Sequence, residues 1–166
     1  MKGFYVFPAI GPTNISFYKD GYEPRGPLGS FLMEHDYTID VRVAPVLRIA
    51  AGQTLSGTLF PDDNIYLLGD DFTEGPYCGN PCKLIRVSAP TAGQLIVQIS
   101  WAGATSEFQL WLDNIESRGI STMTIQKRVQ VGEEVHVYFG LPSLNGFVQT
   151  LAAPVPFRLV TLLEHS

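Results

Sequence analysis

Charged residues are scarce in this chain of 166 residues. They make up 16% of it, against roughly 25% in typical soluble domains, and the net charge is −5. The densest basic stretch, 126–128, holds two adjacent cations, too few to follow a phosphate backbone. We therefore predict no nucleic-acid partner, and an all-β fold with polar, uncharged outer faces would explain the low charge.

Long apolar runs are also missing. No stretch approaches the ~20 apolar residues that a membrane-spanning helix needs, so we predict no membrane insertion. No signal peptide is visible either, because Pro and polar residues interrupt the apolar run that follows Met1 and Lys2. The chain is therefore either cytosolic or a fragment of a longer secreted protein.

Helical periodicity is absent, and apolar residues recur at every second position instead. This alternation puts Leu95, Val97, Ile99 and Trp101 on one face of a strand. The same alternation puts residues 108, 110 and 112 on one face of a second strand, and residues 135, 137 and 139 on one face of a third. Further strands are expected at 3–7, 14–19, 38–43, 54–60, 83–87, 123–129 and 157–163. Many short strands separated by Gly, Pro, Asn or Asp predict an antiparallel β-sandwich, jelly-roll-like, with little or no helix.

Familiar catalytic motifs are lacking too. The sequence has no Gly-x-Ser-x-Gly elbow, no His-Glu-x-x-His and no phosphate-binding loop. A hydrolase without a recognisable motif remains an alternative, with His136 as a conceivable general base. A lone strand histidine is more often a surface or structural residue, so we predict a protein that is not an enzyme.

Only two cysteines occur, Cys78 and Cys82. A closed zinc site needs four ligands, and His35, His136 and His165 lie far apart in the sequence. The spacing also differs from the Cys-x-x-Cys of redox proteins. A local disulfide that clips a loop before the strand 83–87 is the prediction, with two separate buried thiols as the alternative. A disulfide would place the protein in an oxidising compartment.

An acidic stretch precedes the cysteines. Calcium binds six to eight oxygen ligands, and loops between strands supply them well. The alternative is a solvated turn, because Asp also caps turns. The candidate calcium ligands are Asp62, Asp63, Asp70, Asp71 and Glu74; no other cofactor is expected.

Candidate binding residues lie opposite the predicted core face. By alternation, Trp111, Tyr138 and His136 point away from the core, where exposed aromatic rings would contact a sugar or a peptide. Gln98 and Gln109 would orient such a ligand. Two alternatives are open: residues 1–43 cover this face, or the sandwich is locally buried on both sides.

Composition changes near 43–47, and each side of this boundary resembles a known family. The stretches "GFY", "KDGY" and 37–43 resemble the second half of a carboxypeptidase regulatory-like (transthyretin-like) module, which residues 1–43 would form in part. In 47–166, "GQTLSGTLFPDD", "KLIRVSAPTAGQLIVQISWAG", "EFQLWLDN", "VQVGEEVHVYFGL" and "PFRLVTLLE" together resemble the bacterial pre-peptidase C-terminal (PPC-like) β-sandwich.

Both resemblances imply an accessory module of a secreted or cell-surface bacterial protein. Part of the PPC-like family binds collagen and depends on calcium, which implies targeting to a substrate. The prediction is a non-catalytic module that binds a polymer, either a glycan or a protein, through a sheet face. A structural domain that packs against neighbouring domains or subunits is the alternative.

Overall fold

The computed structural model describes residues 46–61, 63, 78–104, 106–113, 115–142 and 150–165, with only the backbone for 13–14, 30–31 and 78–80. Two short strands, β1 (Thr13–Asn14) and β2 (Ser30–Phe31), pair antiparallel. The predicted strands 3–7 and 38–43 lie outside the described residues, as does most of 14–19. The prediction that 1–43 form part of a separate module is untested.

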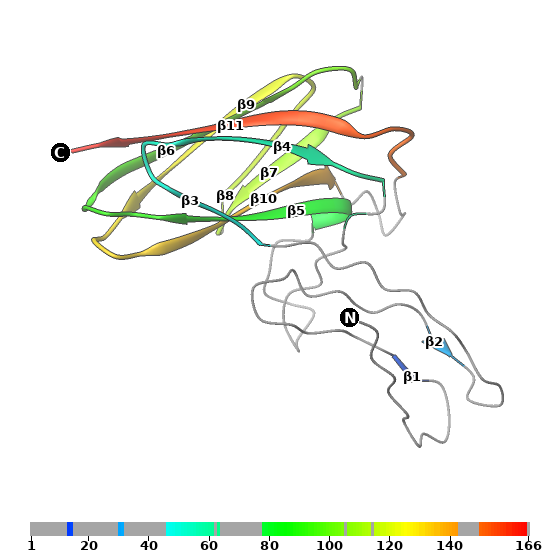
Figure 1. The fold of residues 1–166 in the computed structure, drawn as a ribbon, viewed down its shortest axis with the longest axis horizontal. Helices are drawn as coiled ribbons and strands as arrows, with labels where there is room; N and C mark the ends of the chain where they lie inside the picture. The colour runs from blue at the N-terminus through cyan, green and yellow to red at the C-terminus, as the bar shows by residue number, and fades with distance from the viewer. Residues whose placement is uncertain are drawn as a thin grey trace.

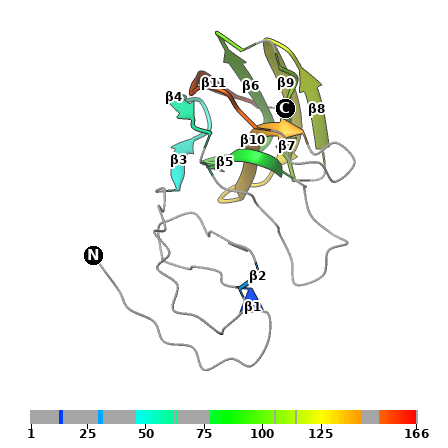
Figure 2. The ribbon, with the colours of Figure 1, turned by 90° about the vertical axis from the view of Figure 1, so that its right-hand side faces the viewer.

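Nine further strands form two sheets that face one another (Figures 1 and 2). The five-stranded sheet has the order β3 (Leu47–Ala50), β5 (Cys78–Ser88), β10 (Glu134–Pro142), β7 (Phe108–Leu112), β8 (Ile115–Gly119). The four-stranded sheet has the order β4 (Thr54–Leu59), β11 (Val155–Glu164), β6 (Gly93–Trp101), β9 (Thr122–Val129). Neighbours pair antiparallel except β3 and β5, which are parallel. The predicted all-β sandwich is confirmed.

The described part of the chain contains no helix long and apolar enough to cross a membrane. Its regular elements are strands, as the period-two pattern predicted. In β6 the odd-numbered residues from Leu95 to Trp101 are buried and the even-numbered ones are more exposed. The same alternation buries 108, 110 and 112 of β7 and 135, 137 and 139 of β10. The predicted core faces of these three strands are therefore confirmed.

Four aromatic rings join the two sheets at one end of the core. Trp101 and Phe157 come from the four-stranded sheet, and Phe108 and Phe139 come from the five-stranded sheet. The centroid of Phe139 lies 5.3 Å from Phe108, 5.4 Å from Trp101 and 5.2 Å from Phe157. Aromatic pairs at such distances contribute about 0.5–1.5 kcal/mol each beyond the burial of their area.

The chain passes from one sheet to the other at the turn between β3 and β4, and a single buried hydroxyl holds this corner. Thr161 of β11 is fully buried. Its Oγ1 accepts hydrogen bonds from the amides of Gly52 (3.0 Å) and Gln53 (3.2 Å), and it donates to the carbonyl oxygen of Gln53 (2.9 Å). Gly52 has a φ of 91°, which favours glycine at this turn.

The opposite side of the sandwich is joined by an ion-pair network. The ammonium of Lys127 on β9 donates to the carboxylates of Asp113 and Glu133, which flank β7 and β10 of the other sheet. Burial alone lowers the pKa of Lys127, but these two hydrogen bonds outweigh it and raise the pKa. The hydrogen bond from Lys127 in turn lowers the pKa of Glu133.

We expect Thr161→Val to destabilise the protein. Valine keeps the shape of the side chain but leaves the amide of Gly52 without its acceptor, at a cost of about 1–3 kcal/mol. The amide of Gln53 keeps its second acceptor, the carbonyl oxygen of Ala50 at 3.2 Å. Urea unfolding of the variant measures this loss. Thr124→Val, at an exposed position of β9, is the control and should change stability by less than about 0.5 kcal/mol. Equal stability of the two variants would contradict the role of Thr161.

Candidate functional site

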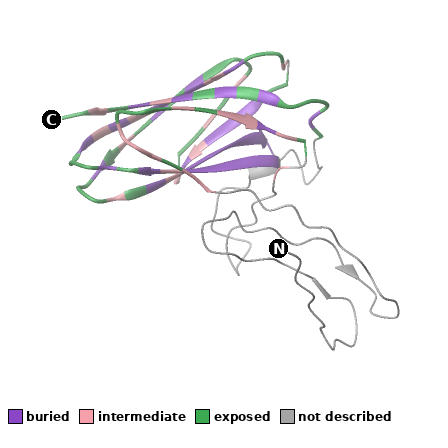
Figure 3. Ribbon diagram, in the orientation of Figure 1, coloured by how far each residue is buried: buried purple, intermediate pink, exposed green. Residues whose placement is uncertain are grey.

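The outer face of the five-stranded sheet is buried at one end. Tyr138 lies in register with Leu84 of β5 on one side and Trp111 of β7 on the other. These three residues and Cys82 form a second apolar cluster, separate from the main core. Figure 3 shows the consequence: β5 and β10 are buried continuously near this end instead of alternating.

The predicted exposure of Tyr138 and Gln109 is therefore wrong. Alternation places both residues opposite the core face, as expected, but Tyr138 is 2% exposed and Gln109 is 1% exposed. This burial agrees with both alternatives from the sequence: cover by residues 1–43, which lie almost wholly outside the described residues, and local burial on both sides of the sheet. Burial raises the pKa of Tyr138 to about 12, so the phenol stays protonated at neutral pH.

Trp111 is half-buried. Its indole Nε1 is inaccessible and has no hydrogen-bond partner among the described residues. An open aromatic platform for stacking needs an accessible ring face, and Trp111 offers only part of one. A binding role for Trp111 stays a prediction.

The other end of this face is charged. Arg48 of β3 and Arg86 of β5 are paired in register, and they donate to separate oxygens of Glu134 at 2.9 and 3.0 Å. The Nε2 of His136 lies 3.6 Å from the same carboxylate. The polar neighbour of His136 is thus an acid held by two arginines. The imidazole ring of His136 also lies edge-on to the ring of Tyr138, with the two centroids 6.5 Å apart.

Asp63 is the one candidate calcium ligand among the described residues, and its carboxylate already has protein partners. One oxygen accepts from Lys83 at 2.6 Å, and the other accepts from the amide of Phe60 at 2.7 Å. Both side chains of the ion pair are less than 10% exposed. The described residues contain no group of three acidic, histidine or cysteine side chains suited to a metal. Asp62, Asp70, Asp71 and Glu74 lie outside them, and calcium binding stays a prediction.

We expect Lys83→Met to be strongly destabilising, because it leaves the carboxylate of Asp63 buried without its counter-charge. Removing one partner of a buried ion pair costs about 3–5 kcal/mol. The double variant Lys83→Met with Asp63→Asn removes both charges and should recover more than half of that loss. Denaturant unfolding of the two variants measures the difference. A loss below about 1 kcal/mol for Lys83→Met alone would mean that the carboxylate reaches water.

Both cysteines lie in β5, so the interpretation of this stretch as a loop before the strand 83–87 is wrong. Cys82 lies opposite Gly140 of β10, and Cys78 lies opposite Pro142. Three residues separate the cysteines, whereas one residue separates their partners, which describes a β-bulge. In a straight strand the two Cα atoms would be about 13 Å apart. Because of the bulge, the two cysteines lie opposite two positions of β10 whose Cα atoms are only about 7 Å apart. This distance is near the Cα–Cα span of a disulfide.

Gly140 allows this bulge to approach β10. A β-carbon at position 140 would lie 2.4 Å from the carbonyl oxygen of Pro81 and 2.9 Å from the Cα of Cys82. Both contacts are with backbone, which cannot move aside as a flexible side chain can. The side chain of Cys78 lies outside the described residues, so its pairing with Cys82 stays a prediction.

The outer face of the four-stranded sheet bears exposed and half-buried side chains along its length. Its side chains form rows across the strands because the register aligns them. One row holds Thr54, Val160, Gln98 and Thr124, and a second holds Ser56, Arg158, Ser100 and Thr122. Gln98 is exposed, as predicted, and donates to the hydroxyl of Thr124 at 3.5 Å. Amide and hydroxyl groups therefore dominate this face.

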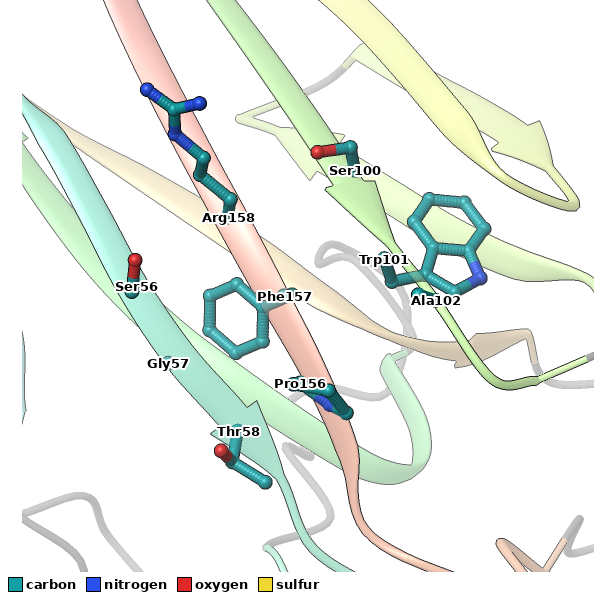
Figure 4. A pocket seen from close by; sticks show the side chains of 9 residues that line it. All are labelled: Ser56, Gly57, Thr58, Ser100, Trp101, Ala102, Pro156, Phe157 and Arg158. Carbon is teal, nitrogen blue, oxygen red and sulfur yellow. The ribbon is translucent and has the colours of Figure 1, made fainter.

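A shallow hollow of about 580 Å³ lies at one end of this face (Figure 4). Its lining residues come from β4, β6 and β11 and from the residue after β6; they are Ser56, Gly57, Thr58, Ser100, Trp101, Ala102, Pro156, Phe157 and Arg158. The side chain of Arg158 projects from β11 between Ser56 and Ser100. Sequence reasoning missed Arg158, because alternation marks it only as an outward-facing residue.

No protein-family model matches this sequence, and no curated protein matches it either. Solved structures with a similar fold include the pre-peptidase C-terminal domain of a collagenase from Bacillus anthracis, with a TM-score of 0.42 and 11% identity over 74% of this chain and 99% of that chain. They also include a GH26-CBM35 β-(1,4)-mannanase from Podospora anserina, with a TM-score of 0.33 and 12% identity over 69% of this chain and 29% of that chain. The β-sandwich within residues 47–166 rests on the strand order and pairing described above.

Proposed function

We propose that this protein is a non-catalytic binding module that holds an extended polymer, a glycan, on the outer face of its four-stranded sheet. One observation carries the proposal: this face is exposed and bears rows of hydroxyl and amide side chains with few charges. Such groups both donate and accept hydrogen bonds, as sugar hydroxyls do. A flat face on paired strands also suits an extended chain.

Apolar contact area on this face supports the same proposal. Val160, Ile96 and Leu162 lie on neighbouring positions of β11 and β6. Leu162 is 52% exposed, a high value for a large apolar side chain, and Ile96 and Val160 are half-buried. Ligand sites combine such apolar surface with a few polar groups that fix orientation. The C–H faces of sugar rings would rest on this strip while their hydroxyls reach Gln98 and Thr124.

The opposite face is a weaker candidate for a polymer. Tyr138 and Gln109 are buried there, and Glu134 already occupies Arg48 and Arg86. Trp111 and His136 remain partly accessible, so a contribution from them is a separate proposal. Trp111→Ala tests it. Loss of binding at unchanged stability would show that the ligand binds the five-stranded sheet instead.

We expect the double variant Gln98→Ala with Thr124→Ala to weaken polysaccharide binding about tenfold. Each lost hydrogen bond is worth about 0.5–1.5 kcal/mol, and two such losses combine to that order. Affinity electrophoresis of the whole chain in gels with soluble polysaccharides measures the effect. Glu116→Ala with Arg118→Ala, an exposed pair on the other sheet, is the matched control and should bind as the wild type does.

Two outcomes would contradict this proposal. If both double variants weakened polysaccharide binding equally, the four-stranded sheet would not be the specific binding site. No retardation by any polysaccharide would reject the glycan module. The alternative of an assembly domain has one supporting observation: Ile115, in the edge strand β8, is 40% exposed, and Ile120, just beyond that strand, is 68% exposed. A stable dimer in light scattering would favour that alternative.

We also propose that the protein is secreted and that Cys78 and Cys82 form a disulfide. In its support, Cys78 and Cys82 are the two cysteines of the chain, and both lie in β5. The bulge in β5 brings the two positions within reach. Closing so short a loop would stabilise the fold by about 2 kcal/mol in the chain-entropy model. Such a bond persists in oxidising compartments.

A thiol assay on protein isolated from its native compartment checks this proposal. We expect no reactive thiol after denaturation without reductant and two reactive thiols after reduction. The denaturant exposes buried cysteines, so burial of Cys82 cannot hide a free thiol. Two reactive thiols before reduction would overturn both the disulfide and the secreted location.

A further inference from the structure

Arg158 differs from most of the described cations because it has no acidic partner. Five of these cations form ion pairs: Arg48 and Arg86 with Glu134, Lys83 with Asp63, Arg118 with Glu116, and Lys127 with Asp113 and Glu133. Arg158 and Arg128 form no ion pair with a described residue. In a chain of net charge −5, the exposed guanidinium of Arg158 is thus available to an outside anion.

The surroundings of Arg158 are neutral and polar. It lies in register between Ser56 of β4 and Ser100 of β6, at the end of the hollow (Figure 4). The acidic residue on the outer face of the same strand is Glu164, six residues along β11 and therefore about 20 Å away. A guanidinium presents a planar set of donors that matches the two oxygens of a carboxylate. The two serine hydroxyls stand beside it as further donors.

We propose that Arg158 binds a carboxylate group of the polymer, so that the ligand is a uronate-bearing polysaccharide. This inference rests on the glycan-binding function proposed above and names its substrate class. In this arrangement the guanidinium holds the carboxylate, Ser56 and Ser100 bind neighbouring sugar oxygens, and Gln98 and Thr124 bind the next sugar unit along the face.

An acidic peptide fits this face less well than an acidic glycan. Arg158 projects from β11, which is paired with β4 on one side and β6 on the other. The backbone groups of β11 are used in these ladders and offer an added strand no partner. The rows beside Arg158 consist mainly of small hydroxyl side chains with Gln98, which match ring hydroxyls better than peptide side chains.

Polygalacturonate and its methyl ester provide the test, because they share one backbone and differ in the carboxylate charge. We expect the wild-type chain to bind polygalacturonate at least tenfold more tightly than the methyl ester in calorimetry at low salt. Arg158→Ala should lower the affinity for polygalacturonate by about 10–100-fold, the range for one lost hydrogen bond to a charged group. It should leave the affinity for the ester nearly unchanged.

Arg128→Ala is the matched control. Arg128 is exposed on the same face and lies three register rows from Arg158, in the row that also holds Gln94 and Glu164. Its loss changes the net charge by the same amount, so non-specific attraction to a polyanion would fall equally in both variants. We expect Arg128→Ala to retain at least half of the wild-type affinity. Both arginines are exposed, so the melting temperatures should match the wild type.

The outcomes separate the two proposals. Selective loss in Arg158→Ala, with Arg128→Ala near the wild type, supports the inference. Equal binding of the acid and the ester by wild type and Arg158→Ala overturns the inference and leaves the glycan module in place. Equal losses in both arginine variants show non-specific attraction and also overturn it. Absence of binding to either polysaccharide and to neutral polysaccharides rejects the module itself.

Discussion

The two-residue period of the strands links the core to the outer faces. A strand that places Phe157 among the aromatic rings of the core must place Pro156 and Arg158 on the opposite side. Gly57 of β4 makes this arrangement possible, since a β-carbon there would lie 2.5 Å from the ring of Phe157. A shift of one residue in register would exchange the two faces of β11 completely. The packing between the sheets therefore fixes the position of Arg158 and its neighbours.

The two outer faces have become chemically different although they belong to one sandwich. On the five-stranded sheet, Leu84, Tyr138 and Gln109 are buried, and charged side chains pair with one another around Glu134 and in the Arg118–Glu116 pair. On the four-stranded sheet, Gln98 and Arg158 are accessible. Buried polar side chains need internal partners, whereas exposed ones are free to exchange water for a ligand. This contrast is the physical reason for placing binding on the four-stranded sheet.

Alternation made much of the fold predictable. It gave the core faces of β6, β7 and β10 because each has three or more apolar residues at every second position. It failed for β3, where four residues with an exposed Arg48 show no clear period, and for β8, an edge strand with the polar sequence Ile-Glu-Ser-Arg-Gly. β3 is held by hydrogen bonds to β5, which is distant in sequence, whereas β8 is held by β7, the strand just before it.

The candidate site was less predictable than the fold, because its properties depend on distant partners. Alternation shows which face Tyr138 occupies but not whether that face is covered. The partner of Asp63 is Lys83, twenty residues away, and no local pattern connects them. Arg158 is conspicuous only because most other described cations have acidic neighbours, which is a property of the assembled sheets.

A site on paired strands also has particular energetic consequences. β11 is hydrogen-bonded on both sides, so the backbone that carries Arg158 is held in place before a ligand arrives, which lowers the entropy cost of binding. A shallow hollow, however, encloses little of a ligand, and each sugar unit would gain only a few contacts. A long polymer compensates for weak individual contacts, because a unit that dissociates remains close to the face and rebinds at high effective concentration. A flat, preorganised and exposed face therefore suits a repeating polymer better than a small molecule.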